Sequence, residues 1–297
     1  MKGIILAGGK GTRLFPATLT ISKQILLIYD KPLIYYPLST IMLGGIRDIL
    51  IITAPETQGL FKMLLKDGSQ WGINIQYQVQ DAPRGLADAF LLGEKYIDNQ
   101  PSVLILGDNI FYGDSLGKRI EQATLLERGA YTFASYVIDP HRYGICEFDE
   151  QDRPLRLTEK PKNPASNWAV TGLYFYDNQV VDYAKSLKPS ARGELEITDL
   201  NKIYLGKSQL QVEKLGRGLA WFDTGTPDSL LNAGEFVRTI ETRQRFKIAC
   251  LEEIALRKKY ISVSQYEQFI DFYKGSDYGH YLETILPEIK VQKEYIK

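Results

Sequence analysis

The chain opens with Met1-Lys-Gly-Ile-Ile-Leu-Ala-Gly-Gly-Lys-Gly-Thr-Arg-Leu14. Its apolar part, Gly3–Ala7, predicts a short strand, and three glycines follow within four positions. Glycine lets backbone N–H groups approach a ligand closely, and N–H groups at the carboxyl end of a strand form a site for anions. The stretch therefore predicts a loop that binds a polyphosphate. The loop residues concerned are Gly8, Gly9, Gly11, Thr12 and the permanently charged Arg13.

The spacing of these glycines differs from two familiar phosphate loops. A Walker A loop requires Gly-x-x-x-x-Gly-Lys-Ser/Thr, whereas here the lysine precedes the last glycine. A dinucleotide fingerprint requires a third glycine where Leu14 stands. An ordinary NTPase or dehydrogenase is therefore disfavoured. The alternative is a strand-to-loop turn without a ligand, and the nearby cations Arg13 and Lys23 argue against it.

Composition limits the class of protein. The 297 residues carry 36 Lys plus Arg and 36 Asp plus Glu, so the formal net charge is zero and a nucleic-acid binder is disfavoured. No apolar run approaches the roughly 20 residues needed to span a bilayer, so we expect no membrane segment. Because the first residues already read as a strand, we also expect no signal peptide.

Cysteine and histidine are scarce. Cys146 and Cys250 are too few for a disulfide scaffold, which favours a cytoplasmic location. His141 and His280 are the only histidines, which disfavours a zinc site. We expect any metal to be a hard cation on carboxylates, such as Mg²⁺.

Strand and helix patterns alternate through the first half of the chain. Such alternation predicts an α/β fold, Rossmann-like, with a mostly parallel mixed sheet flanked by helices. The predicted strands are Gly3–Ala7, Asp48–Thr53, Ile75–Val79 and Val103–Leu106, and the predicted helices are Pro37–Gly44, Gln58–Leu65 and Leu86–Tyr96.

The second half of the chain has a different pattern. Short strand-like pieces split by Pro and Gly predict a small antiparallel extension, followed by helices up to the C-terminus. We expect a catalytic domain over 1–245 and a helical C-terminal appendage over 246–297, within one compact unit. The predicted strands are Tyr131–Ile138, Gly144–Phe148, Leu155–Glu159, Ala169–Tyr176 and Leu210–Lys214. The predicted helices are Val180–Leu187, Ile197–Gly206, Asp228–Arg245, Leu251–Lys259, Ser264–Tyr273 and Asp277–Ile289.

Two carboxylates are candidate Mg²⁺ ligands. Asp108 directly follows the predicted strand Val103–Leu106, and ligands of open α/β sheets collect at the carboxyl ends of strands. Asp223 follows Trp221-Phe222, and Thr226 before Pro227 is the better helix cap, which leaves Asp223 free. The alternative for each carboxylate is a turn or capping role.

Two lysines and one glutamine complete the candidates. Lys23 and Lys160 are candidate phosphate cations, and a surface lysine is the alternative for each. Gln80 follows the strand Ile75–Val79, and its amide can donate and accept at once. Together with a backbone N–H near Gly85 it could pair with the edge of thymine or uracil, although a plain strand–turn–helix connection fits the spacing equally well.

Taken together, these stretches resemble the glucose-1-phosphate thymidylyltransferases of the sugar nucleotidyltransferase family, over essentially the whole chain. The glycine-rich opening is shared by the whole class, whereas Arg192-Gly-Glu-Leu-Glu-Ile-Thr-Asp199 and Trp221-Phe-Asp-Thr-Gly-Thr226 are specific to the thymidylyltransferase branch. The other matching stretches are Ser22-Lys-Gln24, Tyr29-Asp-Lys-Pro-Leu-Ile-Tyr-Tyr-Pro-Leu-Ser39, Gly107-Asp-Asn109, Arg142-Tyr-Gly144, Glu159-Lys-Pro161 and Val170-Thr-Gly-Leu-Tyr-Phe-Tyr176.

The resemblance implies transfer of dTMP from dTTP to α-D-glucose 1-phosphate, giving dTDP-glucose and pyrophosphate with Mg²⁺ as cofactor. The catalytic residues that it implies are Arg13, Lys23, Asp108, Lys160 and Asp223, of which Asp108 and Asp223 bind the metal. The nucleotide-binding residues are Leu6, Gly8, Gly9, Gly11, Thr12, Arg13, Gln24, Gln80, Pro83, Gly85 and Asp108. The sugar-phosphate-binding residues are Leu106, Asn109, Tyr143, Gly144, Glu159, Lys160, Val170 and Trp221.

The resemblance also implies a homotetramer, feedback inhibition by a dTDP-sugar, and a first step toward dTDP-deoxysugars such as dTDP-rhamnose. Three positions depart from the usual pattern: Leu27 stands where proline is common, Lys10 where serine is usual, and Arg84 where aspartate is usual. They leave the reaction type in place and bear on its rate and nucleotide preference. The role of Lys10 stays unassigned.

The chemistry expected is a single displacement at the α-phosphorus without a covalent enzyme intermediate, since a sugar phosphate is already anionic and needs no general base. The same reaction with UTP or another hexose 1-phosphate is an alternative. A catalytically silent nucleotide-sugar sensor is a second alternative, and a dehydrogenase is the weakest.

Overall fold

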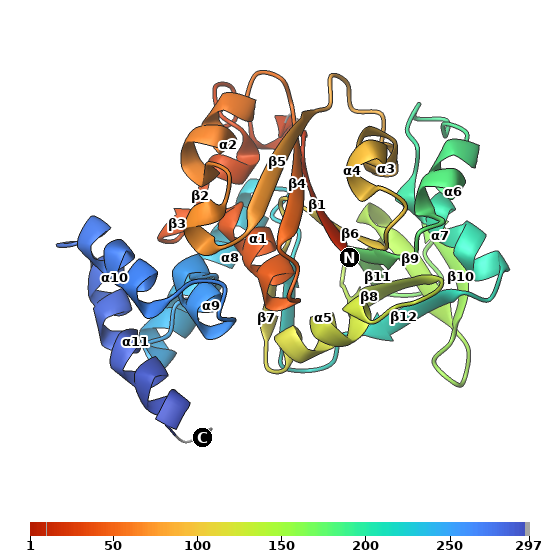
Figure 1. The fold of residues 1–297 in the computed structure, drawn as a ribbon. Coiled ribbons are helices and arrows are strands. Elements are labelled where there is room, and N and C mark those ends of the chain that lie inside the picture. The colour runs from red at the N-terminus through yellow and green to blue at the C-terminus, as the bar shows by residue number, and fades with distance from the viewer. Residues whose placement is uncertain (10, 295–297) are drawn as a thin grey trace.

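The computed structural model describes residues 1–9 and 11–294. In this part of the chain one nine-stranded sheet forms the centre of the molecule (Figure 1). Its strands are β1 (Lys2–Ala7), β4 (Asp48–Thr53), β5 (Asn74–Val79), β6 (Ser102–Leu106), β8 (Ala130–Tyr136), β9 (Gly144–Phe148), β10 (Pro154–Glu159), β11 (Trp168–Tyr176) and β12 (Leu210–Lys214). They run in the order β10-β9-β11-β6-β1-β4-β5, and β8 and β12 continue from β11.

The N-terminal strands form the parallel part of the sheet. β1 pairs in parallel with β4 and with β6, and β4 pairs in parallel with β5. Leu6 on β1 lies opposite Leu106 on β6, and the N–H of Gly107 donates to the carbonyl of Leu6 at 2.9 Å. The glycine-rich loop and the turn that carries Asp108 therefore leave the sheet side by side.

The remaining strands confirm the predicted antiparallel extension. β11 pairs antiparallel with β6, β8 and β9, and β9 pairs antiparallel with β10. β12 pairs in parallel with β8, so this end of the sheet is mixed. The extension continues the main sheet, which gives a single mixed sheet of the predicted class.

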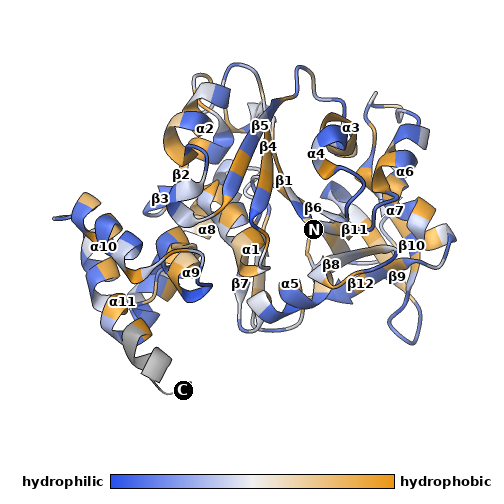
Figure 2. Ribbon diagram, in the orientation of Figure 1, coloured by the Kyte–Doolittle hydropathy of each residue, from blue (hydrophilic) through white to orange (hydrophobic). Residues whose placement is uncertain are grey.

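Helices cover both faces of this sheet, as the alternating pattern predicted. They are α1 (Tyr35–Leu43), α2 (Gln58–Leu65), α3 (Asp88–Leu92), α4 (Glu94–Ile97), α5 (Leu116–Thr124), α6 (Val180–Ser186), α7 (Ile197–Gly206), α8 (Pro227–Gln244), α9 (Leu251–Arg257), α10 (Val263–Phe272) and α11 (Asp277–Glu294). Ile5 faces a core built with α1, α2, α5 and α9, whereas its neighbour Ile4 faces a second core built with α3, α6 and α7. Figure 2 shows apolar residues gathered along these strands.

Two details differ from the sequence expectations. The single helix predicted over Leu86–Tyr96 is wrong: α3 ends and α4 begins around Gly93, where a Cβ would lie 3.0 Å from the carbonyl of Ala89. The nine-residue helix α5 was also missed. Two short pairs of strands were missed because two to four residues carry too little periodicity to detect. These pairs are β2 (Leu27–Ile28) with β3 (Lys31–Pro32), and β7 (Ile110–Gly113) with β13 (Leu219–Phe222).

The C-terminal helices α9, α10 and α11 gather at one side of the molecule, where α9 packs against α1 (Figure 1). None of the helices in the described ranges is long and apolar enough to cross a membrane.

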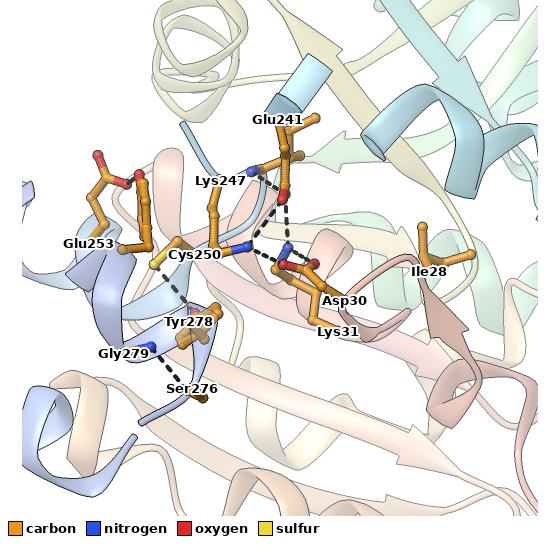
Figure 3. Close-up of polar contacts among 12 residues, drawn as sticks. Ile28, Asp30, Lys31, Glu241, Lys247, Cys250, Glu253, Ser276, Tyr278 and Gly279 are labelled. Carbon is orange, nitrogen blue, oxygen red and sulfur yellow. Dashed lines mark hydrogen bonds and ion pairs between the residues drawn. The ribbon is translucent and has the colours of Figure 1, made fainter. Parts of the chain in front are cut away.

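A ring of four charges, in which Lys31 and Glu241 are buried, joins the beginning of this C-terminal part to the rest of the chain (Figure 3). Lys31 pairs with Asp30 and, at 3.0 Å, with Glu241 on α8. Lys247 pairs with the same two carboxylates, the distance to Glu241 being 3.3 Å. The N–H of Ile248 adds a 2.8 Å hydrogen bond to Glu241. The four residues Asp30, Lys31, Glu241 and Lys247 are called the charge ring below.

Candidate active site

A cavity of about 490 Å³ opens where the glycine-rich loop, the end of β6 and the antiparallel extension meet. It brings together most of the predicted catalytic and sugar-phosphate-binding residues. They are Arg13, Leu106, Asp108, Asn109, Tyr143, Gly144, Glu159, Lys160, Val170, Trp221 and Asp223. A larger cavity of about 640 Å³ lies beside β8 and β12, and none of the described residues that line it was predicted for the site.

The glycine-rich loop leads from β1 toward this cavity. Gly11 has a left-handed backbone (φ 61°) and precedes a single 3-10 turn, Thr12–Leu14. A Cβ at Gly225 would lie 3.2 Å from Oδ2 of Asp223 and 3.3 Å from both terminal nitrogens of Arg13. The Arg13 guanidinium and the Asp223 carboxylate therefore lie close together over Gly225. Lys10 lies outside the described residues.

Lys23 is buried at the centre of the site, so the surface interpretation of this lysine is wrong. Its Nζ donates to Oδ2 of Asp108 at 2.8 Å and to the backbone carbonyl of Asp223 at 3.3 Å. The predicted neighbour Gln24 is buried too, and its side-chain oxygen accepts from Ser22. One ammonium group thus joins the two segments that carry the candidate metal ligands.

Asn109 sets the orientation of Asp108. Its Nδ2 donates to Oδ1 of Asp108 at 2.9 Å, and its own Oδ1 accepts from Nε1 of Trp221 at 2.6 Å and from the N–H of Gly172 at 3.1 Å. Asn109 is buried. Asn109 and Trp221 therefore act in this structure as supports for the carboxylate, beside their predicted place in the sugar-phosphate pocket.

Asp223 directly follows β13 of the two-stranded β7–β13 sheet and does not leave the main sheet. Its Oδ2 accepts from Arg142 at 2.8 Å, and Arg142 also donates to Asp139 at 2.8 Å. Burial, and after it the charge of Asp223, raise the pKa of the Tyr143 phenol well above its usual 10.0, so this hydroxyl stays protonated at neutral pH.

The sugar-phosphate side of the cavity is a network around Glu159. Thr198 donates to Glu159 at 2.6 Å and Arg192 donates at 3.2 Å. A Cβ at Gly144 would lie 2.8 Å from the Thr198 hydroxyl, so only glycine leaves room there. Lys160 is half-exposed, and its Nζ lies 3.6 Å from Glu159.

Sequence reasoning missed Arg142, Arg192, Glu196 and Thr198, all of which line the cavity. Each lies within a family-like stretch, Arg142-Tyr-Gly144 or Arg192–Asp199, which is the signal that could have found them.

The predicted base-reading residues lie next to this cavity. Gln80 is buried at the end of β5, and Gly85 has a backbone φ of 103°. A Cβ at Gly85 would lie 2.4 Å from the carbonyl oxygen of Leu195, and the N–H of Leu195 donates to the carbonyl of Arg84 at 2.8 Å. Pro83 is exposed between them. The loop from Gln80 to Gly85 is therefore hydrogen-bonded to the segment that carries Arg192 and Thr198.

Asp108 and Asp223 suit a hard divalent cation that also takes substrate oxygens. Across residues 1–9 and 11–294, no group of three or more His, Cys, Asp or Glu side chains could hold a metal ion by itself. Two carboxylates with a lysine and two arginines nearby fit a metal bound with phosphates, which is how Mg²⁺ is usually held.

Comparisons with known proteins agree with this arrangement. The nucleotidyl transferase family model matches residues 2–240. A glucose-1-phosphate thymidylyltransferase of Neisseria meningitidis is 56% identical over 286 residues, covering 96% of this chain and 99% of that protein. One from Mycolicibacterium smegmatis is 54% identical, with the same coverage. The crystal structure of a Bacillus anthracis protein in complex with sucrose has a TM-score of 0.75 and 42% identity, covering 80% of this chain and 95% of that one.

The extent of these matches, together with the cavity built from the same segments, shows that the chain belongs to the nucleotidyl transferase family, within its branch of glucose-1-phosphate thymidylyltransferases.

Proposed function

We propose that this chain transfers dTMP from dTTP to α-D-glucose 1-phosphate, releasing pyrophosphate and dTDP-glucose. One observation supports the proposal above all. Buried Lys23 contacts both Asp108 and the backbone of Asp223, and these two carboxylates line the same cavity as Arg13 and Glu159. The strong similarity to named thymidylyltransferases supports the choice of nucleotide and sugar.

The reaction joins two anions. An oxygen of the sugar phosphate attacks the α-phosphorus, an O–P bond forms, and the bond to the β-phosphate breaks with its electron pair leaving on pyrophosphate. Two like charges about 4 Å apart repel by roughly 4 kcal/mol at an effective dielectric near 20. Arg13, Lys23 and Lys160 would offset this repulsion and hold the reacting groups in line.

Asp108 and Asp223 would hold the Mg²⁺ that we propose as cofactor. When bound, this ion supplies further charge neutralisation for the phosphates. Both carboxylates are now paired with cations, Asp108 with Lys23 and Asp223 with Arg142, each at 2.8 Å. We expect substrate phosphates to take over Lys23 and Arg142 as partners, which would release both carboxylates for the metal.

UTP is the second candidate nucleotide. The carbonyl oxygen of Gln80 can accept from the N3–H common to thymine and uracil, and this contact does not involve the 5-methyl group of thymine. A nucleotide-sugar sensor without turnover is the candidate of a different class. We propose, from the family resemblance, that the chain acts as a cytoplasmic homotetramer with dTDP-sugar feedback, at the entry to dTDP-deoxysugars such as dTDP-rhamnose. We also propose residues 246–297 as its assembly and regulatory segment.

Pyrophosphate release tests the proposal directly. The purified chain is supplied with Mg²⁺, dTTP or UTP, and a panel of hexose 1-phosphates, and glucose 1-phosphate with dTTP is expected to react fastest. Asp108→Asn and Asp223→Asn should each lose at least about 100-fold in kcat, since charge stabilisation of this kind contributes most to such reactions. Asp152→Asn, which removes an exposed carboxylate from a remote ion pair with Lys214, is the matched control.

Binding of dTDP-glucose without pyrophosphate release would instead support the sensor. Inversion of configuration at the α-phosphorus is expected for a single displacement, and net retention would contradict it.

A further inference from the structure

Two buried polar side chains, Gln80 and Asp88, face each other behind the proposed base site. Gln80 follows β5 and Asp88 begins α3, and the Nε2 of Gln80 donates to Oδ2 of Asp88 at 2.8 Å. Both residues are buried, with 6% and 4% of their surface exposed. Because carboxylate oxygens only accept hydrogen bonds, the pair holds the amide nitrogen of Gln80 toward Asp88 and its carbonyl oxygen away.

The carbonyl oxygen of Gln80 consequently faces the glycine-rich loop. Oε1 lies 2.9 Å from the position that a Cβ on Gly8 would take. The N–H of Gly85 has no hydrogen-bond acceptor among the described residues and completes the site as a donor. A base entering here meets an acceptor at Gln80 and a donor at Gly85.

Arg84 gives Asp88 its counter-charge. The Arg84 guanidinium lies 3.4 Å from the Asp88 carboxylate and donates to Asp81 at 2.7 Å. Arg84 is the residue that departs from the usual aspartate before Gly85, and here it forms ion pairs with both Asp81 and Asp88. The half-exposed Arg84 thus contacts Asp88, and Asp88 in turn accepts from the amide of Gln80.

We infer that Asp88, neutralised by Arg84, is a positioning residue that fixes the Gln80 amide as an acceptor and so selects bases with an N3–H over cytosine. This inference rests on the proposed function. Thymine and uracil present N3–H as a donor, whereas N3 of cytosine is an acceptor and would face the oxygen of Gln80. Without Asp88 the amide can turn over and present its nitrogen to cytosine.

Nucleotide competition tests this assignment, with dTTP, dUTP and dCTP compared by their kcat/KM for pyrophosphate release with glucose 1-phosphate. Asp88→Ala is expected to lower the ratio of dTTP to dCTP by about tenfold and to leave the ratio of dTTP to dUTP unchanged, since only cytosine differs at N3. Asp88→Asn keeps an acceptor oxygen and is expected to recover most of the discrimination.

Asp81→Ala is the matched control, because it removes an exposed carboxylate from the same arginine, whereas the Gln80 amide donates to Asp88. It is expected to keep the wild-type ratios. If Asp88→Ala does not fold, Asp88→Leu removes the acceptor while filling its space. An unchanged dTTP to dCTP ratio in a folded acceptor-free variant, or equal losses with all three nucleotides, would overturn the assignment. Failure of the wild-type chain to use dTTP would instead overturn the proposed function.

Discussion

Lys23 shows at the residue scale how one side chain can organise a site. Its ammonium group is buried between the Asp108 carboxylate and the backbone of Asp223, so it joins the two segments that carry the candidate metal ligands. A buried lysine with two such partners is a structural link, and we propose that its charge also serves the phosphates of the substrate.

We expect Lys23→Met to lower kcat/KM for pyrophosphate release at least about 100-fold, because it removes a preorganised charge from the reacting phosphates. Lys2→Met is the matched control, since Lys2 pairs with Asp48 at 3.1 Å at the opposite end of β1. Steady-state kinetics with both substrates measure the effect. Equal losses in the two variants would contradict a role for Lys23 at the phosphates.

A second prediction concerns Gly85, which combines a positive φ with a close approach to Leu195. Gly85→Ala is expected to destabilise the fold by several kcal/mol and to weaken dTTP binding, since the methyl group would overlap the Leu195 backbone. Gly193→Ala is the control: Gly193 has φ 74° with no atom within 4 Å of its Cβ position, so only the backbone cost of about 1 kcal/mol applies. Urea unfolding and nucleotide titration separate the two effects.

At the scale of elements, helix α8 begins with a capping box just after Asp223. The Thr226 hydroxyl accepts from the N–H of Ser229 at 3.2 Å, and the Ser229 hydroxyl accepts from the N–H of Thr226 at 2.8 Å. The predicted cap at Thr226 is therefore confirmed. The cap fixes the start of the helix three residues after the candidate metal ligand.

Thr226→Ala is expected to lower the free energy of unfolding by about 1 kcal/mol and also to lower turnover, since the loop bearing Asp223 loses its anchor. Helix α10 offers a matched control, because Ser262 and Gln265 form the same motif within the C-terminal helices. Ser262→Ala should cost a similar stability and leave turnover unchanged. Equal turnover in both variants would show that the cap serves only the helix.

Element prediction succeeded where periodicity was strong. α2, α7, β4, β9 and β12 begin and end where the sequence analysis placed them. It failed for strands of two to four residues, whose pairing depends on a partner elsewhere in the chain. Of the strands that the sequence analysis missed, β13 matters most for the site, because its pairing with β7 brings Asp223 toward Asp108.

At the scale of the whole molecule, the charge ring joins three regions (Figure 3). Asp30 and Lys31 lie in the hairpin after Lys23, Glu241 lies near the end of α8, and Lys247 begins the C-terminal part. The hairpin after Lys23 and the beginning of the C-terminal part therefore share one set of ion pairs. Removing one carboxylate leaves two lysines facing a single negative charge.

Glu241→Gln is expected to destabilise the fold by about 3 kcal/mol, because two lysines then face one carboxylate in a largely buried position. Glu235→Gln, an exposed position on the same helix, is the control and should change stability by less than about 0.5 kcal/mol. Chemical denaturation at pH 7 measures both variants. A loss below about 1 kcal/mol for Glu241→Gln would contradict a stabilising ring.

The acid limit of stability is also expected to depend on this ring. Burial alone would raise the pKa of Asp30, but Lys31 and Lys247 together hold it below its ordinary value of 3.8. A carboxyl with a lowered folded-state pKa contributes stability above its unfolded pKa and loses that contribution as the pH falls through the folded value. Asp30→Asn should therefore lose less stability than the wild type between pH 5 and pH 3, measured by urea unfolding. Asp152→Asn should keep the wild-type acid sensitivity.

The sequence by itself determined the α/β class, and it predicted a phosphate-binding opening loop and two carboxylates as candidate metal ligands, because strand periodicity, glycine spacing and charge are local properties. Only the tertiary structure decided that Lys23 meets Asp108, 85 residues away, and the backbone of Asp223, 200 residues away. The same holds for Asp88 behind Gln80 and for the charge ring. Such contacts depend on strand order and helix packing, which no short stretch of sequence encodes.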